Sequence, residues 1–426
     1  MPEHNKSFFL KPEQLRTGLY IHLDLAWMDH PFPFSSFRIK TEDQLRQIRK
    51  LGLREIRYSP QRSHSEPLPP SAGGAGESPV DEQPNPDLES KRQRVRKLRH
   101  QRQAISKCEH EFAETSQELK AINRNLLSLP EESRGRMTSL AEKMADSLLT
   151  QRDIAVNLMP ERIAGEDFYQ HPLNVAVLSL MLARELNASR EAVIQLGVGA
   201  LLHDIGKLNV PDRLQRLPAL TAAEQALVQE HVAFGLAAGR KLGLASEALT
   251  VIAQHHEAVD GSGYPQHLSG EKISLLAKIV AIANTYDNLC NPANPLRALT
   301  PHEALSQMYA QQRNRFEAGP LSIFIRCLGV YPPGTLVVLG DDAFGMVMSV
   351  NSSRPLRPVV QVYDPRIPHE EAILLDLEQE QELSISRTMR PSQLPREVFD
   401  YLAPRRRVAY YFDLAHSPVP NAQDTP

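Results

Sequence analysis

The sequence predicts a mainly α-helical protein, with a central all-α domain preceded by a small α+β domain and followed by a small β-rich segment. Three observations predict this organisation. Residues 150–330 contain long apolar-periodic segments, residues 1–60 mix strand-like and helix-like patterns, and short β-rich runs follow residue 331. A chain of 426 residues is long enough for two or three such domains.

The first 60 residues account for the small α+β domain. Residues 18–23 and 54–58 have the composition of strands, and Thr41 begins a capped helix that continues through Leu45 and Ile48. Residues 61–88 are rich in Pro, Ser, Gly and Glu, which predicts a flexible linker. Residues 89–148 predict a helical connector, whose basic stretch is interpreted as a solvated helix face rather than a nucleic-acid site.

The central helical domain is predicted at residues 149–330. Within it, Leu173, Val177 and Leu180 recur at helical spacing, which predicts a helix with one buried face. Beyond the turn at 331–334, runs at 335–339, 345–350 and 358–363 predict the β-rich segment. We place this segment at 331–415, before a tail at 416–426, and interpret it as a shield for the helical domain or a dimerisation element.

Composition excludes several classes of protein. A formal net charge of −3 gives no general attraction to a nucleic-acid polymer or an anionic membrane. The three cysteines, Cys108, Cys290 and Cys327, are far apart, which argues against a disulfide framework or a zinc ribbon. The sequence has neither the apolar core of a signal peptide nor an apolar run of about 18 residues. We therefore expect a cytoplasmic protein.

Residues that commonly bind metals gather in the central domain. They are His171, His203, Asp204, His231, His255 and His256. The intervals from 171 to 203, 203 to 231 and 231 to 255 are 32, 28 and 24 residues, and each fits one helix plus a connection. Several helix ends are therefore expected to meet around one pocket. Imidazole and carboxylate ligands together suit iron, manganese, nickel or zinc, and Lys207 supplies a fixed cation near the pair His203–Asp204.

Two motifs carry a resemblance to a known family. Residues 203–207, His-Asp-Ile-Gly-Lys, resemble the HDxGK motif of the HD-superfamily phosphohydrolases. Residues 255–265, His-His-Glu-Ala-Val-Asp-Gly-Ser-Gly-Tyr-Pro, closely resemble the HHExxDGSGYP motif that defines the HD-GYP subfamily. Residues 10–60 are also similar to the small domain of unknown function that often precedes HD-GYP domains.

The resemblance implies an all-α domain that holds two or three divalent metal ions, with iron or manganese expected. It implies as metal ligands His171, His203, Asp204, His231, His255, His256 and, at a third metal, Asp167. Asp204 would bridge two metals, which would activate a hydroxide for attack on phosphorus. Lys207 would contact the phosphate, and Gly261, Gly263, Tyr264 and Pro265 would form the loop beside the substrate.

Two positions depart from the family pattern. Asn284 stands where the family has an Asp ligand, so a neutral carbonyl oxygen replaces a carboxylate. Asp287, one turn further on, is interpreted as a helix-stabilising residue, with a compensating ligand as the alternative. Residues 293–296 replace the usual Arg-Pro-Tyr-Arg segment, and Arg297 is the remaining candidate for a contact to phosphate or guanine.

The favoured function is a phosphodiesterase that hydrolyses cyclic di-GMP to pGpG or GMP, with activity attenuated by Asn284. The alternatives are a degenerate domain that senses cyclic di-GMP or docks a partner, and a hydrolase of another phosphoester. The resemblance also implies a link to motility and biofilm formation. Cyclic di-GMP, signalling proteins of the diguanylate cyclase type and a second copy of this chain are the candidate partners.

Overall fold

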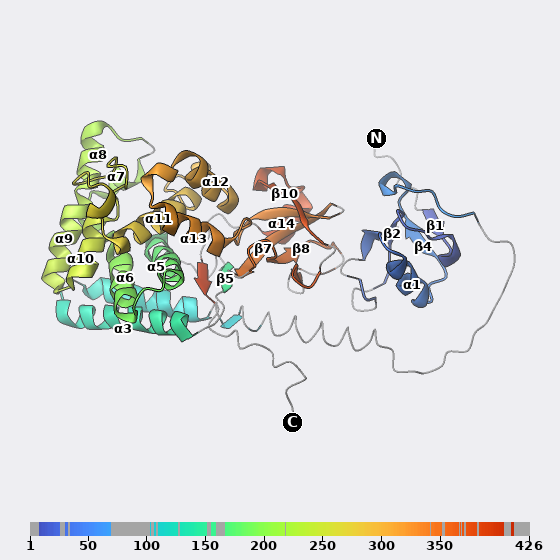
Figure 1. Cartoon of the computed structure of the whole chain (residues 1–426), viewed down its shortest axis with the longest axis horizontal. Coiled ribbons are helices and arrows are strands. Elements are labelled where there is room, and N and C mark those ends of the chain that lie inside the picture. Colours follow the sequence, from blue (N-terminus) through green and yellow to red (C-terminus); the bar gives the residue numbers. More distant parts are fainter. Residues whose placement is uncertain are drawn as a thin grey trace, which may run out of the picture. The chain divides into compact units, whose positions relative to one another are not determined.

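The structure is a computed structural model of the whole chain (Figure 1). It describes residues 8–69, 103, 106–107, 110–150, 155–158 and 167–412, with gaps at 26–29, 33–34, 127, 218, 341, 352–353, 366, 368, 370–371, 381–382 and 404–409. The chain divides into two compact units, one mostly within residues 1–101 and a larger one within the remainder. Most of the predicted linker, at 70–88, and the predicted tail at 416–426 lie outside the described residues.

The first unit is a four-stranded sheet with one helix. The sheet has the order β1–β4–β2–β3, and its described pairs are antiparallel. The elements are β1 (Phe8–Leu10), β2 (Tyr20–His22), β3 (Ser36–Arg38), α1 (Glu42–Lys50) and β4 (Ile56–Tyr58). Thr41 caps α1, because its hydroxyl accepts a hydrogen bond from the Gln44 N–H at 3.2 Å. The predicted small α+β domain is therefore confirmed.

The N-terminal unit continues beyond its predicted end at residue 60. The composition of residues 61–69 places them in the predicted linker, but in the structure their backbone is paired with the unit. The His64 N–H donates to Gly18 O at 2.9 Å, and the Leu68 N–H donates to Gln14 O at 2.9 Å. These hydrogen bonds satisfy the backbone of a segment that has little apolar surface of its own.

The second unit contains a bundle of helices, seen together in Figure 1. They are α3 (Pro130–Thr150), α5 (Asp167–Glu185), α6 (Arg190–Leu202), α7 (Asp212–Arg216), α8 (Ala222–Gln229), α9 (His231–Leu242), α10 (Ser246–Gln254), α11 (Leu275–Cys290), α12 (Pro301–Gln311) and α13 (Ala318–Leu328). The predicted connector belongs to this bundle, since Phe112, Leu119 and Ile122 of helix 110–125 are buried. Leu173, Val177 and Leu180 on α5 are fully buried, as their spacing predicts.

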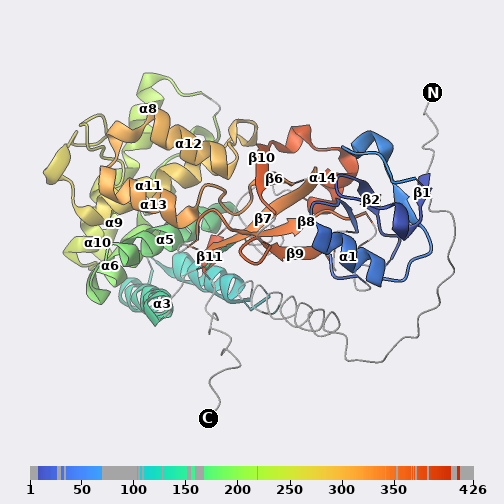
Figure 2. The ribbon, with the colours of Figure 1, turned by 45° about the vertical axis from the view of Figure 1, so that its right-hand side comes forward.

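A seven-stranded sheet completes the second unit. Its strands are β5 (Ala155–Leu158), β6 (Leu336–Leu339), β7 (Ala343–Asn351), β8 (Val359–Val362), β9 (Ile373–Asp376), β10 (Ile385–Met389) and β11 (Tyr410–Phe412), and α14 (Arg396–Leu402) precedes β11. The predicted runs correspond to β6, β7 and β8. Strand β5 was not predicted, because it lies inside the range assigned to the helical domain; it pairs with both β7 and β11. Figure 2 shows β11 next to α5.

The observed architecture confirms the predicted fold class. Along the sequence, a small α+β unit is followed by a mainly helical domain and then by a β-rich segment. Among the helices that the structure describes, none is long and apolar enough to cross a lipid bilayer.

Candidate metal centre

Three helix ends bring the metal-type residues together, as the intervals in the sequence predict. His203 directly follows α6, His231 is the first residue of α9, and His255 directly follows α10. Each of these three histidines is almost completely buried. His171 enters from the second turn of α5. The helices can approach closely because apolar side chains such as Leu202, Val251 and Ile252 fill the space between them.

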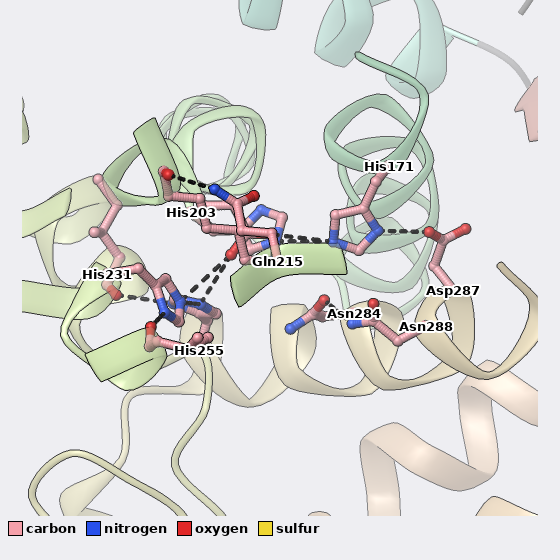
Figure 3. Close-up of polar contacts among 12 residues, drawn as sticks. His171, His203, Gln215, His231, His255, Asn284, Asp287 and Asn288 are labelled. Atoms are coloured by element: carbon pink, nitrogen blue, oxygen red, sulfur yellow. Dashed lines mark hydrogen bonds and ion pairs between the residues drawn. The ribbon is translucent and has the colours of Figure 1, made fainter. Parts of the chain in front are cut away.

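Asp204 lies between two sets of histidines. Figure 3 labels His171 and His203 of one set and His231 and His255 of the other. One set is His171 and His203, whose Nε2 atoms both lie 3.4 Å from Asp204 Oδ2. In the other set, the Nε2 atoms of His231 and His255 lie 3.4 and 3.8 Å from Oδ1. His256 joins this second set, and all its candidate ligand atoms lie within 4.8 Å of one another. The two oxygens of one carboxylate therefore face two separate groups of nitrogen ligands.

The other ring nitrogens fix how these histidines are oriented. The Nδ1 atoms of His203, His231 and His255 lie 2.7–2.8 Å from the backbone carbonyls of Ala200, Val228 and Ile252. A carbonyl only accepts, so each Nδ1 must carry the proton and each Nε2 presents a lone pair to the centre. Metal-binding histidines in proteins are commonly held in this way.

The ligand atoms of the second set are spaced for a bound metal ion rather than for hydrogen bonds with one another. The Nε2 atoms of His231 and His255 are only 3.4 Å apart, and burial lowers the pKa of both rings. Two neutral rings whose Nδ1 atoms donate elsewhere bring two lone pairs together without a proton between them. Asp204 Oδ1 is also buried, and no hydrogen bond to it is found among the described residues. Ligand atoms about 2.1 Å from one divalent ion would be spaced in this way.

The first set is held partly by a proton. Burial by itself lowers the pKa of His171, but hydrogen bonds with Asp204 and Asp287 outweigh it and raise the pKa to about 9. Burial likewise works against the charge on Asp204, yet the nearby Lys207 ammonium and the hydrogen bond from His171 hold the pKa of this carboxyl well below its usual value. Lys207 Nζ lies 2.5 Å from Asp204 Oδ2. Asp204 is therefore ionised and ready to act as a ligand.

Asn284 is buried on α11, and Figure 3 shows it below His171. Its Oδ1 accepts a hydrogen bond from Asn288 Nδ2 at 2.7 Å, so this oxygen already has a partner on its own helix.

Asp287 has a more specific place than the predicted helix-stabilising role. Its Oδ2 accepts a hydrogen bond from His171 Nδ1 at 2.6 Å. Its Oδ1 accepts from Asn174 Nδ2 at 2.7 Å and from Asn291 Nδ2 at 2.8 Å. The hydrogen bond from Asn291 agrees with the predicted helix-stabilising role, and the hydrogen bond from His171, 116 residues away in the sequence, adds a role that was not predicted. Asp287 orients His171 in the way that carboxylates orient metal-binding histidines in proteins.

The loop at residues 261–265 lies against the second set of histidines. Tyr264 stacks on His256, with ring centroids 4.5 Å apart and an angle of 20° between the rings. Gly263 is required by a close approach, because a Cβ there would lie 2.3 Å from the Ala258 N atom. Glu257, whose role was not predicted, is buried and accepts hydrogen bonds from the Gln266 and Leu268 N–H groups at 2.7 and 2.9 Å.

The structure does not bring every predicted residue to this centre. Gly261 has a φ of +80°, as expected for the loop, and Pro265 follows Tyr264 in it. Arg297 is exposed on the short 3₁₀ turn Pro295–Arg297, and among the described residues no side-chain contact joins it to the histidines. Asp167 begins α5, but its side chain lies outside the described part of the chain, so its role stays a prediction.

Comparison with known proteins agrees with the motifs and the geometry. Residues 121–319 match the family model described as an HD domain, and residues 9–131 match a domain of unknown function, DUF3391. Residues 121–319 therefore form an HD domain, and residues 255–265 carry the HD-GYP motif within it. An HD domain implies binding of divalent metal ions, and the cluster around Asp204 has ligand atoms spaced so that it could hold them.

Several curated relatives are similar over the HD-GYP domain. A cyclic di-GMP phosphodiesterase of Pseudomonas aeruginosa is 28% identical over 82% of this chain and 83% of its own length. The cyclic di-GMP phosphodiesterase response regulator RpfG of Xanthomonas campestris is 31% identical over 49% of this chain and 58% of its own length. A 3'3'-cGAMP-specific phosphodiesterase of Vibrio cholerae is 38% identical over 31% of this chain and 28% of its own length. These relatives support a metal-dependent phosphodiesterase.

Among solved structures, an HDG"Y"P protein from Bdellovibrio bacteriovorus aligns with a TM-score of 0.43 and 15% sequence identity. The alignment covers 74% of this chain and 97% of that protein.

Proposed function

We propose that this HD-GYP domain hydrolyses cyclic di-GMP to pGpG, and pGpG further to GMP. The observation that carries the proposal is the position of Asp204, whose two carboxylate oxygens face two separate sets of histidine nitrogens. Such an arrangement suits two ions joined by one carboxylate, and two-metal sites are common in enzymes that cleave phosphate esters. The relatives named as cyclic di-GMP phosphodiesterases support the choice of substrate.

The proposed ligands divide between the two ions. His171 and His203 would bind on the Oδ2 side of Asp204, and His231, His255 and His256 on the Oδ1 side. Iron or manganese is the expected metal, because both accept mixed imidazole and carboxylate ligands. When bound, the two ions would lower the pKa of a water molecule and stabilise the charge that develops on the phosphoryl oxygens.

The protein side chains would bind and orient the phosphodiester. The Lys207 ammonium is partly exposed, at 31% of its side chain, and one of its three N–H donors is directed to Asp204. Its remaining donors are suited to a phosphoryl oxygen, where a fixed positive charge stabilises the transition state. Tyr264 places a flat ring beside His256, on which a guanine base would stack. Glu257 would keep the 261–265 loop in position for this contact.

The test is hydrolysis of cyclic di-GMP by the full chain, purified without oxygen and supplied with Fe²⁺ or Mn²⁺. We expect pGpG to form, and we expect no product with the Asp204→Asn variant, whose size is unchanged. Arg240→Ala, which changes an exposed arginine in the last turn of α9, is a control outside the cluster and should retain cleavage. Parallel assays with 3'3'-cGAMP decide the substrate, since some relatives carry that name. Faster cleavage of 3'3'-cGAMP than of cyclic di-GMP would refute the proposed substrate.

A second candidate, a cyclic di-GMP sensor without catalysis, is favoured by one observation. Asn284 contributes no negative charge, and its Oδ1 is hydrogen-bonded to Asn288. The double change Asn284→Asp with Asn288→Ala supplies a carboxylate and removes the side chain that occupies the oxygen. If cleavage is attenuated by Asn284, this variant should bind more metal and turn over faster. If the wild type binds the nucleotide, cleaves none of it, and the double variant is equally inactive, the sensor is correct.

A further inference from the structure

We propose that the C-terminal strand β11 positions the metal ligand His171 through a chain of three hydrogen bonds. The inference rests on the metal centre of the proposed function, but not on catalysis. The chain runs from the backbone of Tyr410 through Asn174 and Asp287 to His171. Asn174 and Tyr410 are thus positioning residues, which act on the centre without touching a metal or a substrate.

Each step of this chain is a short contact between buried groups. The Tyr410 N–H donates to Asn174 Oδ1 at 3.1 Å, and Asn174 Nδ2 donates to Asp287 Oδ1 at 2.7 Å. Asp287 Oδ2 then accepts from His171 Nδ1 at 2.6 Å. Asn174, Asp287 and Tyr410 are each fully buried. A buried amide uses both its carbonyl and its N–H groups here, so its orientation is fixed by the two partners.

Tyr410 is held in place by contacts of its own, so it can fix the end of the hydrogen-bonded chain that is farthest from His171. Its hydroxyl lies 2.9 Å from the hydroxyl of Tyr286 on α11, and Tyr286 packs in turn against Phe324 on α13. The backbone of β11 pairs with β5, with Tyr410 opposite Leu158. Figure 2 shows this strand beside α5, the helix that carries both Asn174 and His171. The strand is therefore held by the sheet on one side and by the helical bundle on the other.

The four histidines differ in what holds them, and this difference makes the inference specific. His203, His231 and His255 each bond to a carbonyl three residues earlier in the same chain segment. The orientation of each ring therefore depends on backbone close to it in the sequence. His171 is the one of these four whose Nδ1 bonds to a side chain on another helix, and that side chain is linked in turn to β11. A disturbance at Asn174 should therefore weaken one ion position and spare the other.

The experiment is a titration of chelator-treated full-length protein with Mn²⁺, in which free Mn²⁺ is counted by electron paramagnetic resonance. The variant Asn174→Leu replaces the amide with an apolar side chain of similar size. We expect the affinity of one ion to fall by about 10- to 100-fold, as for other lost partners of metal-binding histidines. The second ion, on the side of His231 and His255, should bind as in the wild type.

Two control variants separate positioning from a general loss of stability. Tyr410→Phe removes the hydroxyl contact with Tyr286 but keeps the ring contact, the pairing of β11 with β5 and the backbone N–H that Asn174 requires. Because these contacts still hold the strand, both Mn²⁺ affinities should stay unchanged. Leu180→Ala lowers stability from the same helix, because Leu180 is fully buried, but Leu180 is not a member of the hydrogen-bonded chain. It should lower Tm and leave both affinities as they are.

Several results would overturn the proposal. Unchanged Mn²⁺ binding by Asn174→Leu would do so, and so would an equal selective loss in Leu180→Ala. If Asn174→Leu does not fold, Tyr410→Ala serves instead, since it loosens β11 and retains the side chain of Asn174. Tyr410→Ala should then weaken the same single ion, and two unchanged affinities would refute the inference. Because no turnover is measured, a wild type that binds two ions and cleaves nothing would contradict only the proposed function.

Discussion

Gly206 offers a test of whether the centre depends on close contact between two helical segments. This glycine follows Asp204 in the 3₁₀ turn Ile205–Asn209, which lies directly against the start of α9. A Cβ at position 206 would lie 1.9 Å from the carbonyl oxygen of His231 and 2.4 Å from the N atom of Gly235. Both neighbours are backbone atoms, so neither moves aside by changing a rotamer.

The size of the expected effect follows from these distances. Ordinary van der Waals contact begins at 3.4 Å, so Gly206→Ala must separate the two segments by about 1.5 Å, which is 3.4 minus 1.9. Ligand positions tolerate only about 0.2 Å. Asp204 and His231 lie on the two segments that move apart, so the Oδ1 side of the centre should lose its metal. Overpacking costs about 1–3 kcal/mol, which lowers Tm by roughly 2–12 °C for a domain of this size.

The assay is metal content per folded chain after reconstitution, together with a thermal unfolding curve. Gly135→Ala is the matched control, since Gly135 is exposed within α3 and a Cβ there meets nothing within 4 Å. Alanine is favoured over glycine in a helix by about 1 kcal/mol, so this control should gain stability and bind metal normally. A Gly206→Ala protein with full metal content and an unchanged Tm would refute the reasoning.

Three further predictions concern the loop, the lysine and the metal. Glu257→Gln removes the charge from hydrogen bonds that are worth about 1.5–3 kcal/mol, so the loop at residues 261–265 should be held less firmly. KM for cyclic di-GMP should then rise at unchanged metal content, and an unchanged KM would exclude a role of Glu257 in positioning the loop. Lys207→Met should lower kcat by about 10²–10³-fold without loss of metal, as measured by initial rates and elemental analysis. Removing metal with a chelator should lower Tm, because an ion at 100 times its Kd stabilises the fold by about 2.7 kcal/mol; identical unfolding curves would argue against a resident metal.

The sequence was sufficient to predict the helices and the meeting of the histidines. Helical periodicity is a local signal, and the intervals between His171, His203, His231 and His255 match one helix plus a connection each. These local signals are enough to place the metal-type residues at helix ends. The motif glycines also agree with the structure, since Gly263 lies where another backbone segment leaves no space for a side chain.

The remaining features depend on partners that are distant in the sequence. Asn174 and Tyr410 are 236 residues apart, and neither residue has a local pattern that reveals the bond between them. Asp287 lies in a regular helix and is therefore interpreted from sequence as a helix-stabilising residue, although its partner is His171 on α5. Strand β5 has four residues and exists through its pairing with β7 and β11, so a search for long alternating runs does not find it.

The neutral side chain of Asn284 bears on both the enzyme hypothesis and the sensor hypothesis, because it changes the charge of the centre. A neutral side chain leaves the centre one negative charge short of a site with aspartate at this position. The proposed substrate, cyclic di-GMP, has two phosphodiester groups with one negative charge each, so the missing charge favours the bound substrate and the transition state to a similar degree. Interactions that favour both equally lower KM without raising kcat. If the proposed function is correct, Asn284 should therefore lower KM, and it should lower turnover only by reducing the amount of metal that Asp204 and its histidines hold.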